Sequence, residues 1–256
     1  METRERRKRI LEALNTQYTI KVADLSRDLF VSEATIRRDL EKLERSGHLK
    51  RIYGGAMQVG SIDTETPVDV RRQLNAGAKE KISQLAVREI RSGQVISMDS
   101  STTVLYLVPH LRAFENLTVL THGVRTVEEL QHFKNINLYC SGGLMLRNSY
   151  SFAGEFARRF FSSFYTDISF FACKGISMEH GISWAYDEEA ALRKIMLNNT
   201  KKRILLCDST KFDSTYTSTM FGFESIDILI TDKDPGPVWR NFLMEHRVQL
   251  IYPGCR

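Results

Sequence analysis

The sequence is poor in cysteine and proline, and it contains no long hydrophobic run. Its 256 residues include four cysteines, none in a Cys-x-x-Cys pair, so neither a disulfide framework nor a zinc ribbon is expected. No apolar stretch approaches the roughly 20 residues that a membrane-spanning helix needs. Five prolines and a hydrophobic content of 42% exclude a collagen-like or disordered chain. The six histidines are scattered and pair with no cysteine at ligand spacing, so no metal centre is predicted.

The N-terminus and the cysteines indicate the compartment. Residues 1–9 are polar and densely charged, and no apolar stretch follows them, so no secretory signal is expected. Cys140, Cys173 and Cys207 each lie in or at the end of an apolar run, and we expect them to be buried free thiols. With Cys255 they fit a chain that lives in a reducing compartment. A cytoplasmic protein is predicted.

The positive charge is unevenly distributed. Residues 1–57 contain 13 Lys or Arg against 9 Asp or Glu, whereas residues 58–256 contain 23 against 22. Most of the net charge of +5 therefore lies in the first fifth of the chain. A small basic module joined to a nearly neutral larger one is typical of a protein whose first part binds a polyanion.

The basic segment has the pattern of a small α+β winged helix-turn-helix domain. Apolar spacing predicts a helix over 5–14 and a second over 20–29, the latter capped by Thr19. A third helix is predicted to begin after Ser32 as N-cap and to end at Ser46-Gly47. A strand over 48–53 then turns at Gly54-Gly55 as a wing.

The third helix carries the predicted DNA contacts, because residues near the start of a recognition helix reach base edges in the major groove. With the apolar stripe turned inward, its outward face offers Ser32, Glu33, Thr35, Arg37, Arg38 and Lys42. The wing adds Lys50, Arg51 and Tyr53 for phosphates or the minor groove. The alternative is a solvated amphipathic helix whose arginines pair with Asp39, Glu41 and Glu44.

The rest of the chain is predicted to be a linker over 58–78, with a short helix near 68–74, and an α/β domain over 79–256. Short apolar runs predict strands at 94–98, 117–120, 137–140, 168–173, 203–207, 227–230 and 248–252. Amphipathic stretches predict helices at 79–91, 102–111, 124–133, 151–161, 187–199 and 238–246. Alternation of apolar strands with helices indicates a mainly parallel sheet flanked by helices.

Polar residues follow the first five predicted strands, where ligands bind in such sheets. They are Asp99, Ser100, Ser101, Thr102, Thr103, then His122, Gly142, Gly143, Lys174, Asp208 and Lys211. Backbone N–H groups, hydroxyls and a lysine at one edge suit a phosphorylated polyol. Any one of these loops is also an ordinary turn or helix cap. Their convergence favours an effector site.

Both parts of the chain resemble the DeoR family of bacterial transcription regulators. The run Ser-Glu-Ala-Thr-Ile-Arg-Arg-Asp-Leu at 32–40 is similar to the family signature, and Tyr-Gly-Gly-Ala at 53–56 to its wing. In that signature we interpret Asp39 as orienting one of the arginines. Residues 99–103, 142–143, 174–176 and 208–212 resemble the family's sensor loops, and the helix with Glu189 resembles the one that faces the site.

The resemblance implies a DNA-binding regulator, a repressor of a carbohydrate operon, controlled by a phosphorylated sugar or related metabolite. It also implies a sensor fold similar to ribose-phosphate isomerases and coenzyme A transferases. A homodimer or homotetramer is expected, because helix-turn-helix proteins read paired half-sites. No cofactor and no membrane partner is expected.

Three residues depart from the family pattern. Ser101 replaces a usual glycine, His122 a common asparagine and Arg193 a usual lysine. A side chain at position 101 is expected to crowd the anion and to disfavour left-handed backbone angles. His122 is open to two interpretations, a ligand contact or a packed turn residue.

Two other classes of function compete with this prediction. A sugar-phosphate isomerase-like enzyme with a fused DNA-binding module would use Asp99, Lys174, Asp208 and Lys211 as acids and bases. A dinucleotide-binding redox sensor would need a G-x-G-x-x-G turn after the first strand, and residues 99–103 have none. The fused DNA-reading module favours regulation over turnover, so no catalytic residue is predicted.

Overall fold

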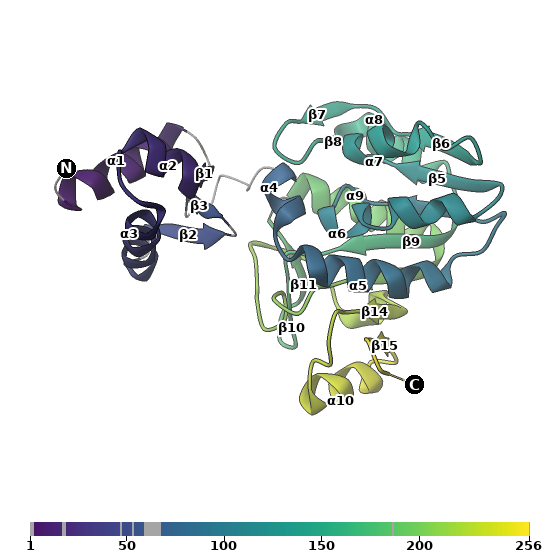
Figure 1. Ribbon diagram of the computed structural model, residues 1–256. Helices are drawn as coiled ribbons and strands as arrows, with labels where there is room; N and C mark the ends of the chain where they lie inside the picture. Colours follow the sequence, from purple (N-terminus) through teal and green to yellow (C-terminus); the bar gives the residue numbers. More distant parts are fainter. Residues whose placement is uncertain are drawn as a thin grey trace. The chain divides into compact units, whose positions relative to one another are not determined.

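The computed structural model describes residues 3–16, 19–46, 48–52, 54–58, 68–185 and 187–255. The chain forms two compact units, Met1–Leu74 and Asn75–Arg256 (Figure 1). Within the described ranges, no helix has the length and apolar character needed to cross a membrane. Each unit has a hydrophobic core of its own.

The first unit has the helix-turn-helix and wing predicted from the sequence. Its helices are α1 (Thr3–Thr16), α2 (Val22–Asp28), α3 (Glu33–Arg45) and α4 (Val68–Gln73). Its strands are β1 (Thr19–Lys21), β2 (Leu49–Ile52) and β3 (Gly55–Gln58), paired antiparallel in the order β1-β3-β2. The core joins the three first helices to the wing through Ile10, Leu14, Leu25, Ile36, Leu40, Leu43 and Leu49.

The ends of these elements confirm one predicted cap and correct another. Ser32 is the N-cap of α3, and its Oγ accepts a hydrogen bond from the Thr35 backbone N–H at 3.3 Å. The predicted cap of the second helix by Thr19 is wrong. Thr19 pairs with Met57 in β1, and α2 begins after Lys21 without a side-chain cap. The predicted cap at Gly47 lies outside the described residues, as do positions 59–67 of the predicted linker.

The second unit is built on a seven-stranded parallel sheet of order β15-β14-β12-β9-β4-β5-β6. Its strands are β4 (Val95–Met98), β5 (Leu117–Thr121), β6 (Ile136–Cys140), β9 (Thr166–Ala172), β12 (Thr200–Leu206), β14 (Ile228–Ile230) and β15 (Gln249–Ile251). These are the seven strands that the apolar runs predict. Smaller antiparallel pairings add a hairpin, β7 (Leu144–Leu146) and β8 (Ser151–Ala153), and a sheet of β10 (Gly175–Ser177), β11 (Gly181–Trp184) and β13 (Ser218–Phe221).

Helices cover both faces of the parallel sheet (Figure 1). On β12, Ile204 and Leu206 pack with residues of α5, α6 and α7, whereas Leu205 packs towards α9 and α10. The α-helices are α5 (Ala76–Ala86), α6 (Thr102–Leu105), α7 (Val124–Leu130), α8 (Gly154–Ser162), α9 (Asp187–Asn198) and α10 (Pro237–Glu245). Short 3-10 helices lie at η1 (Val87–Glu89), η2 (Val108–Ala113) and η3 (Phe223–Ser225). Side chains that alternate along one strand therefore enter two different cores.

Two local predictions for this unit are wrong. The helix predicted from 151 begins only at Gly154, because Ser151–Ala153 pair with Leu144–Leu146 as a hairpin. Cys140 is exposed, because β6 is the last strand of the sheet and its end is not covered. Cys173 and Cys207 are buried free thiols, as predicted, with their sulfur atoms 3.8 Å apart.

Candidate functional site

The outer face of α3 is a polar surface. Ser32, Glu33, Arg37, Arg38 and Lys42 are exposed and Thr35 is half-buried. Arg37 forms an ion pair with Glu33 at 2.6 Å. By contrast, neither Arg38 nor Lys42 forms an ion pair or a side-chain hydrogen bond with any described residue.

On the wing, Lys50 and Arg51 lie in β2, and Arg51 is exposed. The backbone N–H of Arg51 donates to the Glu44 carboxylate at 2.7 Å, which ties the wing to α3. Tyr53 lies outside the described residues. The structure therefore places Arg37, Arg38 and Lys42 of α3, with Arg51 of the wing, at the surface of one small unit.

Asp39 has a different role from the one predicted. Its side chain is only 4% exposed and lies between Arg6 and Arg7 of α1, with the Arg7 Nε donating to Oδ1 at 3.0 Å. It does not orient Arg37 or Arg38, because it sits on the inner side of α3. The carboxylate instead fixes α3 against α1.

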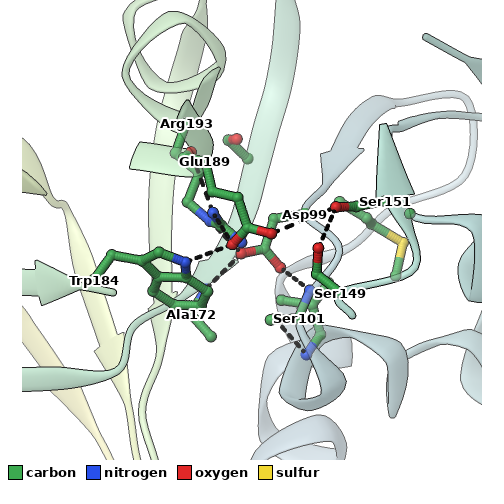
Figure 2. Close-up of polar contacts among 12 residues, drawn as sticks. Asp99, Ser101, Ser149, Ser151, Ala172, Trp184, Glu189 and Arg193 are labelled. Carbon is green, nitrogen blue, oxygen red and sulfur yellow. Dashed lines mark hydrogen bonds and ion pairs between the residues drawn. The ribbon is translucent and has the colours of Figure 1, made fainter. Parts of the chain in front are cut away.

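At the carboxyl edge of the parallel sheet, Asp99 follows β4 and is fully buried (Figure 2). Its Oδ1 accepts the Ser101 N–H at 2.9 Å, and its Oδ2 accepts the Ala172 N–H at 3.2 Å and the Arg193 Nε–H at 2.8 Å. Both carboxylate oxygens are thus engaged within the protein. Asp99 holds the loop after β4 in place.

Arg193 joins this carboxylate to α9 and β11 (Figure 2). Its guanidinium is fully buried, lies 3.4 Å from the Glu189 carboxylate and stacks 3.9 Å from the centre of the Trp184 ring. Trp184 donates its indole N–H to Glu189, and the Ser151 Oγ–H donates to the other Glu189 oxygen at 3.4 Å. Burial alone would raise the pKa of Glu189, but Arg193 and hydrogen bonds from Ser149 and Trp184 outweigh it and lower the pKa to about 2.

His122, which follows β5, faces this charged group. The side chain is completely buried, and neither ring nitrogen has a hydrogen-bond partner. Its ring meets Phe161 edge-on at 5.8 Å. Burial, with a smaller contribution from the Arg193 charge, lowers the pKa of His122 to about 4, against the opposite pull of Asp99 and Glu189. The imidazole is therefore neutral at pH 7.

The stability of the protein should fall between pH 7 and pH 5 because of His122. The unfolded imidazole takes up a proton near pH 6.5, whereas the folded one does not until about pH 4. Protons therefore favour the unfolded state in this window, and stability present above pH 6.5 is lost as the pH falls towards 4. We expect a loss of about 2 kcal/mol between pH 7 and pH 5.

The measurement is urea unfolding at a series of pH values, with His122→Asn as the control. The variant should show a flatter profile over the same range, since asparagine does not titrate. Glu189 does not interfere, because the stability it contributes is lost only as the pH falls below about 4.5 towards 2. If the unfolding free energy fell equally with pH in wild type and in His122→Asn, the assignment of this pH dependence to His122 would be contradicted.

Ser101 needs no glycine-like backbone. Its φ is −71°, and its Oγ accepts the Val104 N–H at 3.3 Å as N-cap of α6. The expected conflict with left-handed backbone angles is therefore wrong. Thr102 and Thr103 are buried in the first turn of α6, and Ser100 is half-buried with its Cα close to Gly123.

A second group of predicted residues gathers after β12. Asp208 is buried, and its Oδ1 accepts hydrogen bonds from the Thr210 N–H at 3.0 Å and from the Asn75 amide at 3.2 Å. Lys211 is half-buried, and its amine makes no hydrogen bond or ion pair with a described residue. After β9, Lys174 lies with its amine 5.9 Å from the centre of the Trp184 ring.

Two residues of this edge were missed from the sequence. Asn75 and the buried Lys79 belong to the start of α5, which the sequence prediction places in the linker or at its boundary. The hydrogen bond from Asn75 to Asp208 joins positions 133 apart in the chain. Asn75 has a φ of +54°, a left-handed conformation that asparagine adopts more readily than most residues.

The paired glycines lie in the loop between β6 and β7. Gly143 has a φ of +115°, and a Cβ there would come within 2.6 Å of the Ala153 carbonyl oxygen. Its lack of a side chain is therefore explained by packing against the hairpin. Within the part of the chain that the structure describes, neither Gly142 nor Gly143 forms a hydrogen bond with the group around Asp99. Within the described ranges, no set of three or more His, Cys, Asp or Glu side chains is placed to hold a metal ion.

A helix-turn-helix unit with an exposed basic reading face, joined to an α/β unit with a polar strand edge, defines a ligand-responsive DNA-binding regulator. Residues 6–61 match the DeoR-like helix-turn-helix domain, and residues 74–233 match the DeoR C terminal sensor domain. The chain belongs to the DeoR family of transcription regulators.

Curated relatives match over nearly the whole chain. The uncharacterized HTH-type transcriptional regulator YulB of Bacillus subtilis is 34% identical, over 96% of this chain and 95% of its own length. The HTH-type transcriptional regulator GolR of Listeria innocua is 35% identical, over 89% and 90%. The putative aga operon transcriptional repressor of Escherichia coli O157:H7 is 31% identical, over 90% and 87%.

Proposed function

We propose that this regulator is a repressor of a carbohydrate operon whose DNA binding is controlled by a phosphorylated sugar or related metabolite. The observation that carries the proposal is Lys211, a half-buried cation whose amine has no hydrogen bond to a described residue, in the loop after β12 that Asp208 organises. This loop lies at the same edge of the parallel sheet as the loop that Asp99 organises after β4. An amine in that setting can bind an anion through a charge-assisted hydrogen bond. One relative is named as an operon repressor, which supports the direction of control.

The isomerase-like alternative is disfavoured by family membership and by chemistry. Asp99 has no exposed surface, and its carboxylate is held by Ser101, Ala172 and Arg193, which disfavours a role as general base. The proposed organisation is a DNA-binding domain over 1–57, a linker over 58–78 and an effector domain over 79–256. The second compact unit begins at Asn75, so the effector domain takes in the start of α5 as well. The protein acts on double-stranded DNA in the cytoplasm.

The proposed DNA contacts lie on α3 and the wing, and the exposure and pairing of the described residues support those on α3. The base edges are contacted from the first turns of α3, by Ser32, Glu33, Thr35 and Arg37. Bases or phosphates are contacted by Arg38, Lys42, Lys50, Arg51 and Tyr53. Arg37 must exchange its ion pair with Glu33 for a DNA contact, whereas Arg38 and Lys42 have no ion pair to break. Arg38 is therefore the stronger candidate for a large single contribution.

Replacing Lys211 by alanine should weaken binding of a sugar phosphate about ten- to hundredfold, because one charge-assisted contact is lost. Isothermal titration with the sugar phosphate that gives the largest thermal shift is the measurement. The DNA affinity of the unliganded protein should remain, so the variant should stay bound to DNA when the sugar phosphate is added.

Lys201→Ala is the matched control. Lys201 lies at the opposite end of β12, is 65% exposed and pairs with Asp167, and its loss changes the net charge equally. The control should bind the sugar phosphate normally. Equal binding of phosphorylated and unphosphorylated forms by wild type would remove the phosphate from the proposed function.

Self-association is the second part of the proposal, since each chain has one reading helix and operators carry paired half-sites. We expect a homodimer or homotetramer at micromolar concentration by light scattering. DNA with two half-sites should bind about 100-fold or more tightly than DNA with one, because linked modules raise the effective concentration. A monomer that binds both DNAs equally would refute this part.

A further inference from the structure

The His122 side chain is buried without a hydrogen-bond partner, although charged side chains lie around it. The side chain has no exposed surface, and both ring nitrogens lack a hydrogen bond. The groups that face it come from three elements: Asp99 after β4, Glu189 and Arg193 on α9, and Phe161 on α8. Leaving a buried polar atom unpaired is costly. Such a group in a native fold indicates a hydrogen-bond partner that is supplied from outside the chain, such as a ligand atom.

The two neighbouring carboxylates are already satisfied by other groups. Asp99 accepts from Ser101, Ala172 and Arg193, and Glu189 accepts from Trp184 and Ser151 and pairs with Arg193. The imidazole is therefore not needed to complete this network. Its two nitrogens remain available, one as a donor and one as an acceptor.

The local charge decides which part of an effector fits. Two carboxylates and one guanidinium give the group beside His122 a formal charge of −1. This net negative charge favours an uncharged group over a phosphate dianion, and an uncharged hydroxyl can both donate to and accept from a neutral imidazole.

We propose that His122 is a specificity-determining contact that binds an uncharged hydroxyl group of the effector, apart from the subsite that binds its anion. The proposal rests on the proposed function, and it separates two subsites: Lys211 for the charge and His122 for the polyol. The low pKa of His122 keeps the ring neutral at physiological pH, which suits both hydrogen bonds.

Because the His122 side chain has no exposed surface, a ligand reaches the ring only if a neighbouring segment moves, and the β7–β8 hairpin is such a segment. The Phe152 N–H donates to the His122 carbonyl at 2.8 Å, and the Val124 N–H donates to the Tyr150 carbonyl at 2.8 Å, so the hairpin lies against this loop. Gly143 and Gly154, with φ of +115° and +82°, flank the hairpin. Glycines at both ends allow a backbone change at small cost. The structure thus shows the covered form of the subsite.

The test uses full-length wild type, His122→Phe and His122→Asn. Thermal-shift screening with pentose, hexose and alditol phosphates, their unphosphorylated forms and inorganic phosphate identifies the probe, and calorimetry measures its affinity. His122→Phe keeps a ring and removes both nitrogens, so it should keep or raise the melting temperature. It should weaken the sugar probe at least tenfold while leaving inorganic phosphate within twofold. His122→Asn keeps a donor and an acceptor and should retain most of the affinity.

Each contrary result has a separate meaning. Unchanged sugar binding in His122→Phe would overturn the proposal and leave the ring as packing or as a partner of buried water. Equal weakening of sugar and inorganic phosphate would overturn it too, because His122 would then sense the anion. If only unphosphorylated sugars bind wild type and His122→Phe loses them, the phosphate in the proposed function fails while the role of His122 stands. If no sugar binds wild type, both fail.

A second measurement needs no variant. In wild type labelled with ¹⁵N-histidine, the His122 ring signals should shift on addition of the sugar probe and stay fixed with inorganic phosphate. A deoxy analogue of the probe that lacks the contacted hydroxyl should bind about tenfold more weakly. Fixed ring signals with a bound sugar would overturn the contact even if His122→Phe failed to fold.

Discussion

Replacing Arg193 by alanine should lower the free energy of unfolding of the sensor unit by about 3–5 kcal/mol, because it removes the cation from a buried ion-pair network. Arg193 has no exposed surface, and its partners Asp99 and Glu189 are 0% and 3% exposed. Without the guanidinium, two buried carboxylates would face each other with less compensation. The stacking on Trp184 would be lost as well.

The measurement is urea unfolding followed by tryptophan fluorescence, with Arg159→Ala as the matched control. Arg159 is 76% exposed on α8 and pairs only with Glu155 among the described residues, so its loss should cost at most about 1 kcal/mol. Arg193→Lys keeps the charge but lacks the planar guanidinium that reaches both carboxylates. Its loss of unfolding free energy should therefore lie between those of Arg193→Ala and Arg159→Ala. A cost below 1.5 kcal/mol for Arg193→Ala, on the order of a surface pair, would contradict the network.

This network also explains why the sensor loops are organised before any ligand arrives. Asp99 connects the start of α6, the end of β9 and α9 through Ser101, Ala172 and Arg193. The buried Arg193–Asp99 ion pair thus couples the position of α9 to that of the loop after β4. An effector bound beside His122, as proposed above, would lie next to Asp99 and α9 of this network.

The main sheet could be predicted because its strands are apolar on both faces and are read from local sequence. Val95–Met98 and Ile204–Leu206 are short apolar runs followed by polar loops, and the carboxyl edge follows from parallel order. The hairpin and the small antiparallel sheet were missed. Ser151–Ala153 has three residues, and only pairing with Leu144–Leu146 makes it a strand.

The contacts of the site could not be predicted, because they join distant positions. Asp99 and Arg193 are 94 residues apart, and the sequence marks Arg193 only as a replacement for lysine. Asn75 lies in the predicted linker, yet it bonds to Asp208. The unpaired state of His122 depends on the geometry of three elements, which no local pattern encodes.

The contacts of Asp39 with Arg6 and Arg7 also join distant positions and could not be predicted. Because of them, we expect Asp39→Ala to change DNA affinity in the opposite direction from the one that charge alone predicts. Removing an acidic residue from the DNA-binding unit raises its positive charge, so electrostatics alone predicts tighter DNA binding by Asp39→Ala. Asp39, however, holds α3 to α1 through Arg6 and Arg7 from a buried position. We expect a loss of about 3 kcal/mol in the stability of this unit and a fall in DNA affinity of at least about 100-fold.

Arg38→Ala is the comparison variant, because it should remove one DNA contact without displacing α3. Arg38 is exposed and unpaired among the described residues, so its removal should weaken DNA binding by about 1–3 kcal/mol with little change in unfolding. Fluorescence anisotropy with DNA selected from a random pool, together with urea unfolding, measures both quantities in both variants. Asp39→Ala should lose stability and affinity together, and its salt dependence should become shallower as fewer phosphates are engaged. Tighter binding by Asp39→Ala would show that α3 keeps its place without the carboxylate, and that charge alone governs the reading face.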